Sequence, residues 1–168
     1  GPGARPLPSL AKPGGWAQLF RGGGIEMTAL TDMLQSHPQK PTTHMNEISA
    51  AIDACFEAEK ITTICADACI AEKEFEMLRE CIRLDLDCAD ICSATGRLIA
   101  RQAQPKPDLW RAALQACIEV CRACAAECGK HADRFEHCRI TQECCERTMQ
   151  ACQRALDALP QGGAETRH

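Results

Sequence analysis

Four long segments of the chain repeat apolar side chains at intervals of three, four or seven residues, which is the period of an amphipathic α-helix. No segment shows the two-residue alternation of a β-strand. The pattern predicts helices over about 43–71, 74–102, 108–128 and 133–159. Pro105 and Pro107 separate the second helix from the third, Asp108 is a candidate N-cap, and Gly129 is a candidate stop. A shorter helix is predicted near residues 28–36 and ends before Pro38.

Four helices of similar length with short connections predict an all-α fold, an antiparallel up-down-up-down four-helix bundle over residues 45–159. Residues 27–44 would form the short N-terminal helix and a linker. Residues 1–26 are rich in glycine and proline and are expected to be a disordered leader or the remnant of a tag. Residues 160–168 are expected to form a flexible tail.

Cysteine occupies most of the inward-facing positions of these helices. Thirteen of the fourteen cysteines fall on one narrow face per helix, and the four cysteines of the third helix lie within roughly 60° of one another. Cys144 lies about 100° from the stripe of its own helix and does not fit the pattern. The thirteen cysteines in register are Cys55, Cys65, Cys69, Cys81, Cys88, Cys92, Cys117, Cys121, Cys124, Cys128, Cys138, Cys145 and Cys152.

These thiols are expected to face the inside of the bundle, because Ile52, Ile99 and Leu114 share their faces. Such a high cysteine content would indicate disulfides in a short secreted chain, but disulfide scaffolds are small and loop-rich, whereas this chain has helices that can build a core. A thiol-lined bundle is therefore interpreted as a metal-binding interior. The alternative is that the thiols simply pack as small hydrophobic groups. Thiols fill a core less well than leucine or phenylalanine, and aromatic residues make up only 4% of the chain.

The spacing of the thiols bears on the choice of metal. Thiolates select Cu(I), Zn(II) or iron–sulfur clusters. Structural zinc and iron–sulfur ligands usually come in short, loop-borne groups, whereas here the recurring unit is two cysteines one helical turn apart. Cu(I) accepts low coordination, so bridging thiolates could hold about one ion per cysteine, on the order of 10–14 ions. Neutral thiols can be buried without metal, and each arriving Cu(I) would displace about one proton.

The pairs Cys65/Cys69, Cys88/Cys92, Cys117/Cys121 and Cys124/Cys128, together with Cys138, Cys145 and Cys152, resemble the bacterial copper storage proteins. The resemblance covers about residues 45–159. It implies a cysteine-lined four-helix bundle that holds many Cu(I) ions, commonly as a homotetramer. The chain is similar to the cytosolic members, which have no signal sequence, so the resemblance also implies a cytoplasmic location.

The two ends of the predicted bundle differ in chemistry. One end gathers Cys69, Cys128 and Cys138 with Met77 and His131, whose thioether and imidazole are suitable copper ligands. Met77 is on the stripe of Cys81, one turn away, and is expected to face inward. We therefore expect copper to enter there, although packing would explain Met77 equally well and His131 could be a surface-loop residue. His137 is nearby but points about 100° away from the stripe. The other end should be an apolar plug, made by Ile48, Ile52, Ile99, Trp110, Leu114 and Leu156.

Several classes of function are excluded. The net charge is −4 and neither sign forms a long block, which argues against nucleic-acid binding. No stretch approaches the ~20 apolar residues of a membrane span, and no nucleophile–base arrangement indicates an enzyme. The leading interpretation is cytosolic storage or buffering of many Cu(I) ions. The alternatives are a zinc or mixed-metal sequestration protein and a structural helical bundle with packed cysteines.

Overall fold

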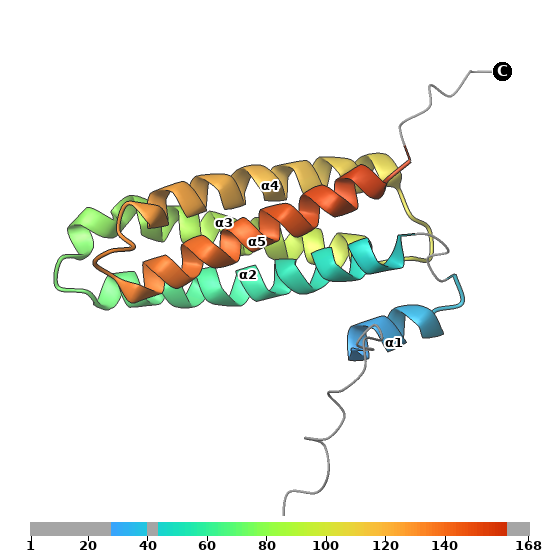
Figure 1. Cartoon of the computed structure of the whole chain (residues 1–168), viewed down its shortest axis with the longest axis horizontal. Helices are drawn as coiled ribbons and strands as arrows, with labels where there is room; N and C mark the ends of the chain where they lie inside the picture. The colour runs from blue at the N-terminus through green and yellow to red at the C-terminus, as the bar shows by residue number, and fades with distance from the viewer. Residues whose placement is uncertain (1–27, 40–43, 161–168) are drawn as a thin grey trace, which may run out of the picture.

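The fold was obtained as a computed structural model, which describes residues 28–39 and 44–160. The predicted leader and nearly all of the predicted tail lie outside these residues. Within the described residues the chain is all-helical, without strands, and four long helices pack together as a bundle (Figure 1). The predicted fold class is therefore confirmed. The helices are α1 (Ala29–Ser36), α2 (Met45–Ala71), the 3₁₀ turn η2 (Phe75–Leu78), α3 (Arg79–Ala100), α4 (Pro107–Gly129) and α5 (Glu136–Ala158).

The four long helices form a closed ring around one interior. Helices adjacent in sequence pack against each other, and α5 packs back against α2, so each long helix has two neighbours. The short connections reverse the chain each time, which gives the antiparallel arrangement expected of such a bundle. The short helix α1 lies outside the ring (Figure 1), but its Leu34 is buried and belongs to the same hydrophobic core.

The ends of the helices differ from the predictions in ways that local chemistry explains. The second long helix starts as the 3₁₀ turn η2, a common form of a helix terminus. Asp108 is not the N-cap of α4, because Pro107 occupies the first helical position and Lys106 precedes it. Asp108 instead lies in the first turn, where a carboxylate interacts favourably with the helix dipole. Helix α5 begins three residues later than predicted, after an extended and buried Phe135.

One end of the interior is closed by apolar side chains, as the sequence indicates. Ile52, Ile99 and Leu114 are almost completely buried, and Trp110 is 7% exposed. Leu156 is only half-buried, and Leu159, the C-cap residue that follows α5, is buried in its place. This plug closes the end of the bundle where α2 and α4 begin, so the thiols are shielded from water on that side.

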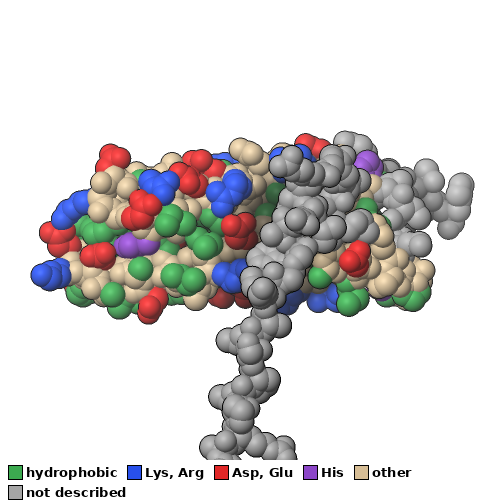
Figure 2. Space-filling view, turned by 60° about the horizontal axis from the view of Figure 1, so that its bottom comes forward, with side chains coloured by type: hydrophobic (Ala, Val, Ile, Leu, Met, Phe, Trp, Pro, Cys, Tyr) green, Lys and Arg blue, Asp and Glu red, His purple; other side chains and the backbone are tan. Residues whose placement is uncertain are grey.

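The outer surface is charged and mixed in sign. Acidic and basic side chains are interspersed on the face shown in Figure 2. Many of them pair along one helix; Arg83, for example, reaches both Glu80 and Asp87 on neighbouring turns of α3. None of the described helices combines the length and the apolar character that a membrane-spanning helix requires.

Helices α2 and α3 approach each other closely at Gly96. A Cβ atom at this position would lie 3.2 Å from the Cβ of Cys55 and 3.3 Å from the ring of Phe56. Glycine weakens an exposed helix interior, but here the missing side chain lets α2 carry Cys55 into the centre of the bundle. The glycine therefore helps to set the spacing of the innermost thiols.

We predict that Gly96→Val destabilises the metal-free protein by about 1–3 kcal/mol, because the added atoms overpack the α2–α3 contact. Urea unfolding followed by helical circular dichroism measures this change. Ala94→Val, on the exposed face of the same helix, is the matched control and should change stability by about 0.5 kcal/mol, the helix-propensity difference alone. Equal effects of the two substitutions would contradict the close approach at Gly96.

Candidate metal centre

The interior of the ring is lined by thiols. All fourteen cysteines are free and buried, and the thirteen predicted to be in register are each at most 1% exposed. Their sulfur atoms come from all four long helices. Within each helix the 3.6-residue period keeps positions three, four and seven residues apart on one face, so the thiols of that helix point to the same side. The thirteen fall into five groups in which all ligand atoms lie within 4.8 Å of one another, and some of these groups share a cysteine. The described interior is therefore a nearly continuous column of sulfur.

Seven thiols next to the apolar plug form what we call the inner pool. Neighbouring sulfur atoms in this pool are close across helices: Cys92 lies 3.5 Å from Cys117, and Cys88 lies 3.6 Å from Cys121. Cys55 lies 3.7 Å from Cys152 and so joins α2 to α5. The inner pool consists of Cys55, Cys88, Cys92, Cys117, Cys121, Cys145 and Cys152.

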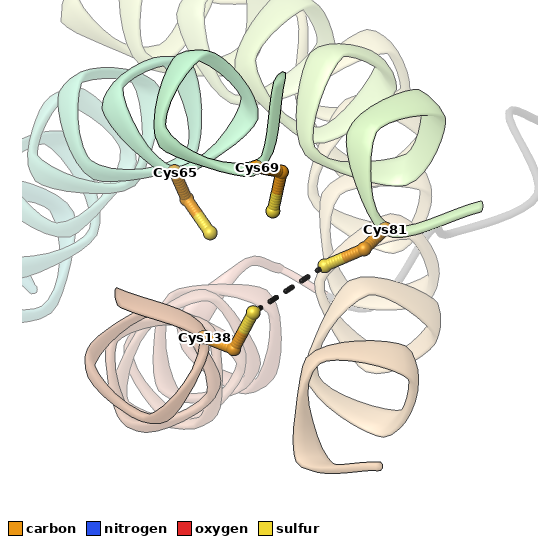
Figure 3. A group of neighbouring side chains, drawn as sticks. All are labelled: Cys65, Cys69, Cys81 and Cys138. Carbon is orange, nitrogen blue, oxygen red and sulfur yellow. Dashed lines mark hydrogen bonds between the residues drawn. The ribbon is translucent and has the colours of Figure 1, made fainter. Parts of the chain in front are cut away.

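Five thiols at the opposite end form the outer pool, which consists of Cys65, Cys69, Cys81, Cys128 and Cys138. The sulfur of Cys81 lies 3.2 Å from that of Cys128 and 3.9 Å from that of Cys138. Figure 3 shows Cys65 and Cys69 of α2, Cys81 of α3 and Cys138 of α5 pointing toward one another. These four ligand atoms are all within 4.8 Å of each other.

Oxygen atoms separate the two pools. Two sulfur contacts set the relative height of α3 and α5: Cys81 contacts Cys138, and Cys88 contacts Cys145. Asp85 lies between Cys81 and Cys88 on α3, and Thr141 lies between Cys138 and Cys145 on α5. Asp85 and Thr141 are therefore at the same level of the bundle. Thr62 occupies the corresponding inward position of α2, between Cys55 and Cys65. Asp85, Thr141 and Thr62 are each 0% exposed. We call these three residues the oxygen layer; at this level α4 alone contributes a thiol, Cys124.

Asp85 is a member of the site that the sequence analysis did not name. Its carboxylate accepts from the thiol of Cys124 at 3.1 Å, from Cys128 at 3.6 Å and from Cys81 at 3.9 Å. It also belongs to a four-residue group of possible metal ligands with Cys65, Cys81 and Cys128. Its place in the sequence, four residues after Cys81 and three before Cys88, is on the thiol stripe and could have revealed it.

The interior favours uncharged groups. Burial, with a further contribution from Cys65, raises the pKa of the Asp85 carboxyl to about 8. Hydrogen bonding to Cys117 and Cys152, followed by burial, raises the pKa of the Cys55 thiol far above its ordinary value, whereas hydrogen bonds from Cys121 and Cys152 lower the pKa of Cys117. The low dielectric of a dry core disfavours charged acids in general. Burial acts against charge on each of these thiols, so the metal-free column favours neutral thiols around a carboxyl group that holds its proton near neutral pH.

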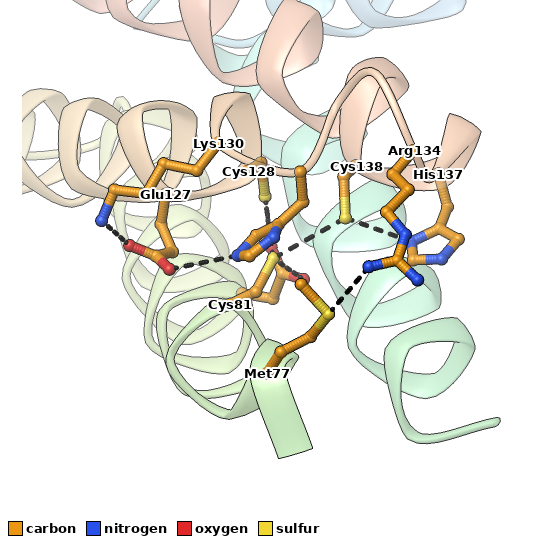
Figure 4. A network of polar contacts seen from close by, with 10 residues as sticks. Met77, Cys81, Glu127, Cys128, Lys130, Arg134, His137 and Cys138 are labelled. Atoms are coloured by element: carbon orange, nitrogen blue, oxygen red, sulfur yellow. Dashed lines mark hydrogen bonds and ion pairs between the residues drawn. The ribbon is translucent and has the colours of Figure 1, made fainter. Parts of the chain in front are cut away.

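Met77 and His131 lie at the end of the bundle next to the outer pool, and both face other polar groups. Met77 is 45% exposed, and its sulfur accepts from the Arg134 guanidinium at 3.4 Å (Figure 4). The His131 side chain is 11% exposed, with its Nε2 atom 3.4 Å from the Glu127 carboxylate. Glu127 also pairs with Lys130 at 2.5 Å. The prediction that Met77 points into the column is therefore wrong, because Met77 belongs to the short 3₁₀ turn rather than to α3.

His137 contacts the thiols, contrary to the prediction from its helical angle. Its Nδ1 atom lies 3.4 Å from the sulfur of Cys65, 3.5 Å from that of Cys138 and 3.8 Å from that of Cys69. Its Nε2 atom lies 3.4 Å from the Glu72 carboxylate. The angle was misleading because His137 is in the first turn of α5, where a long side chain can reach α2 across the open end. Such a carboxylate partner fixes the orientation of an imidazole.

Cys144 is buried but stands apart from the sulfur column. It belongs to none of the five ligand groups, in keeping with its position off the stripe of α5. Burial, with Glu57 as the next cause, raises the pKa of its thiol to about 11. Cys144 is thus an ordinary buried thiol at the flank of α5.

Comparison with known proteins agrees with this geometry. The family model described as copper storage protein matches residues 44–157, well over half of the chain. The chain therefore belongs to the copper storage protein family, and its predicted family is confirmed. Membership of this family makes it a metal store and not an enzyme.

Two solved structures and one curated relative are similar to the chain. The copper storage protein Ccsp from Streptomyces lividans, solved loaded with 10 copper equivalents, is 39% identical; the match covers 77% of this chain and 99% of that one, with a TM-score of 0.75. A structure of the cytosolic copper storage protein from Streptomyces lividans with five coppers is 42% identical, over 68% and 96% of the two chains, with a TM-score of 0.67. The uncharacterized cysteine-rich protein YhjQ of Bacillus subtilis is 36% identical over 90 residues, 54% of this chain and 78% of that protein.

The raised pKa of Asp85 predicts a pH-dependent stability of the metal-free protein. The carboxyl is protonated in both states below its ordinary value of 3.8, and between 3.8 and about 8 only the folded chain keeps the proton. Folding stability should therefore fall as the pH rises through this range, by up to about 1.4 kcal/mol per pH unit, and level off above it. Asp85→Asn, which cannot ionise, should lack this component.

Urea unfolding of the reduced, chelator-treated wild type and of Asp85→Asn at several pH values measures the difference. We expect the stability of the wild type relative to Asp85→Asn to decrease from about pH 5 to about pH 7. A difference between the two proteins that does not change with pH would show that the Asp85 carboxyl is already ionised in the fold.

Proposed function

We propose that this protein stores Cu(I), holding on the order of 10–14 ions on the thiolates of its thirteen column cysteines. The observation that carries the proposal is the column itself. Thirteen sulfur atoms from four helices lie in five groups whose ligand atoms are within 4.8 Å of one another, and contacts such as that between Cys92 and Cys117 link neighbouring groups. A site for one ion needs two to four ligands, whereas a column of this length provides bridging positions for many. The structure loaded with 10 copper equivalents, to which the chain is similar, supports a large capacity.

Charge balance supports the same function. A column of bare thiolates would be prohibitively unfavourable in a dry core, but neutral thiols are tolerated. Each bound Cu(I) replaces about one proton, so the loaded interior also stays near neutral. Protein and cargo can therefore be buried together with little change in net charge, and the bundle does not need to open when it fills.

We place the end where copper enters at the outer pool. The opposite end is closed by Ile52, Ile99 and Leu114. His137, whose side chain is 21% exposed, bridges between solvent and the sulfur atoms of Cys65 and Cys138. Met77 and His131 lie further out, where a thioether and an imidazole can receive an ion before it reaches the thiols. In this proposal Met77 and His131 are outer ligands and His137 is the inner one.

Asp85 adds an oxygen ligand to the store. Its carboxylate lies within reach of Cys81 and Cys128 of the outer pool and of Cys124. Cys124 in turn forms a ligand group with Cys88 and Cys145 of the inner pool. A carboxylate is a weaker ligand than a thiolate for a soft ion. Asp85 therefore suits an ion that passes between the outer and inner pools better than a final resting place.

Zinc sequestration remains the alternative that a specific observation favours. Four thiols all within 4.8 Å, such as Cys65, Cys69, Cys81 and Cys138, are also the ligand set of a structural zinc site. A tetrahedral ion uses four thiolates at once, so thirteen cysteines could hold only a few zinc ions. The two metals therefore differ in stoichiometry.

We further propose a cytosolic location and assembly as a homo-oligomer, specifically a tetramer. The similarity to a cytosolic copper storage protein supports the location. The resemblance of the cysteine pattern to that family supports the tetramer. Exposed apolar side chains on the outer faces of α2 and α3, including Ile64, Leu86 and Ile91, offer surfaces for such contacts.

Titration of the reduced, metal-free protein with Cu(I) tests the proposal. We expect saturation at roughly one ion per column cysteine, on the order of 10–14 ions, and only a few ions with Zn(II). Cys145→Ser should lower the Cu(I) capacity, while Cys144→Ser, a matched control one residue away, should not. Saturation with one or two Cu(I) ions would favour a structural bundle instead.

Uptake kinetics test the proposed end for copper. His137→Ala should slow Cu(I) uptake by about tenfold, because the entering ion loses a ligand and losses of this size follow even when a group that only supports metal ligands is removed. Met77→Ala combined with His131→Ala should slow uptake less and leave the capacity unchanged. His44→Ala, at the start of α2 beside the plug, is the control. Stopped-flow absorbance of the copper–thiolate band measures the rate, and unchanged rates in all variants would contradict uptake at this end.

A further inference from the structure

The hydroxyl of Thr141 is buried without a partner. Thr141 is 0% exposed, and its Oγ1 atom makes no hydrogen bond. Among the described residues no other buried side-chain nitrogen or oxygen atom lacks a hydrogen-bond partner. A buried hydroxyl in this state destabilises a fold, and nearly all such groups in proteins are satisfied. An exception inside a binding interior therefore calls for a functional explanation.

Other buried threonines of the bundle show that a local partner is normally used. Thr62 donates to the carbonyl of Ala58 at 2.8 Å, and Thr148 donates to the carbonyl of Cys144 at 2.9 Å. Both bonds run to the carbonyl four residues earlier, the usual choice of a threonine inside a helix. Thr141 makes no such bond to His137. Its hydroxyl therefore makes no hydrogen bond, although the backbone of the same helix offers an acceptor.

The sulfur atoms near Thr141 become stronger hydrogen-bond acceptors when the store fills, although the net charge of the interior stays near neutral. It follows Cys138 by three residues and precedes Cys145 by four, so it lies on the same helix face as one thiol of each pool. It also lies level with Asp85 in the oxygen layer. A neutral thiol is a weak hydrogen-bond acceptor. The sulfur of a copper-bound thiolate keeps partial negative charge, and hydrogen bonds to charged acceptors are stronger than those to neutral ones.

We infer that the Thr141 hydroxyl is a positioning donor for a copper-bound thiolate at the junction of the outer and inner pools. In the metal-free protein it has no partner, and in the loaded protein it donates to the sulfur. The store thereby gains affinity at the one level where α2, α3 and α5 supply oxygen instead of sulfur. This inference rests on the proposed function, because it requires Cu(I)–thiolate bonds inside the column.

The inference predicts that loss of the Thr141 hydroxyl has opposite effects on the metal-free and the copper-loaded protein. Thr141→Val removes the hydroxyl but keeps the shape, so the metal-free protein should be as stable as the wild type or more stable in urea. Chelator competition should show Cu(I) bound on the order of tenfold more weakly at the affected step. Thr141→Ser should restore the affinity, and the ultraviolet copper–thiolate band should differ from wild type only in the valine variant.

Thr148→Val is the control on the same helix. Its hydroxyl is already bonded to the carbonyls of Cys144 and Ala54, so this variant should lose stability without metal and keep its relative affinity for Cu(I). Two results overturn the inference: unchanged Cu(I) affinity of Thr141→Val, or a loss of metal-free stability as large as that of Thr148→Val. A wild type that binds only one or two ions would instead overturn the proposed function itself.

Discussion

Close contact between uncharged sulfur atoms in a dry interior is the constraint on which this protein depends. Thiols from different helices approach to between 3.2 and 3.9 Å, a spacing that a row of thiolates could not adopt in a low-dielectric core. Burial and mutual hydrogen bonding hold the proton on thiols such as Cys55. The interior can therefore exist in two compatible forms, protonated and metal-bound, and both are near neutral. Storage follows from exchanging one monovalent cation for another at each sulfur.

The rest of the bundle serves this column in different ways at its two ends. Ile99, Leu114 and their neighbours keep water from the inner pool, while Gly96 lets α2 and α3 close around Cys55. At the other end the chain leaves His137 partly exposed against the outer pool. The oxygen layer lies between the pools and interrupts the sulfur on three of the four helices. An interruption at this level is a natural place to regulate passage, since carboxylate and hydroxyl groups bind a soft ion less firmly than thiolates do.

Much of this architecture could be predicted from the pattern of residues. Helical period alone put thirteen cysteines on inward stripes and left Cys144 outside them, and the structure brings those thirteen together. The apolar plug followed from the same reasoning. The errors arose where the assumption of one straight helix fails. Met77 was assigned to the stripe of α3, but it belongs to a 3₁₀ turn with a different angle per residue. The helical angle of His137 predicts that it points away from the stripe, but a side chain at a helix end can reach a neighbouring helix. Residue type does not point to Asp85, since a carboxylate is not an expected ligand for a soft ion, but its spacing from Cys81 places it on the thiol stripe.

The sequence by itself determined that four amphipathic helices would enclose a thiol-lined interior, because a 3.6-residue period fixes which side chains of one helix share a face. It also narrowed the choice of metal to soft ions, and the number of thiols indicated that many ions are bound. Only the tertiary structure decided which thiols of different helices meet, since the relative height of neighbouring helices is set by loops and core packing and not by the period of either helix. That register brings Cys124 to Asp85, joins His137 to Cys65 across the open end, and leaves Thr141 without a partner between the two pools.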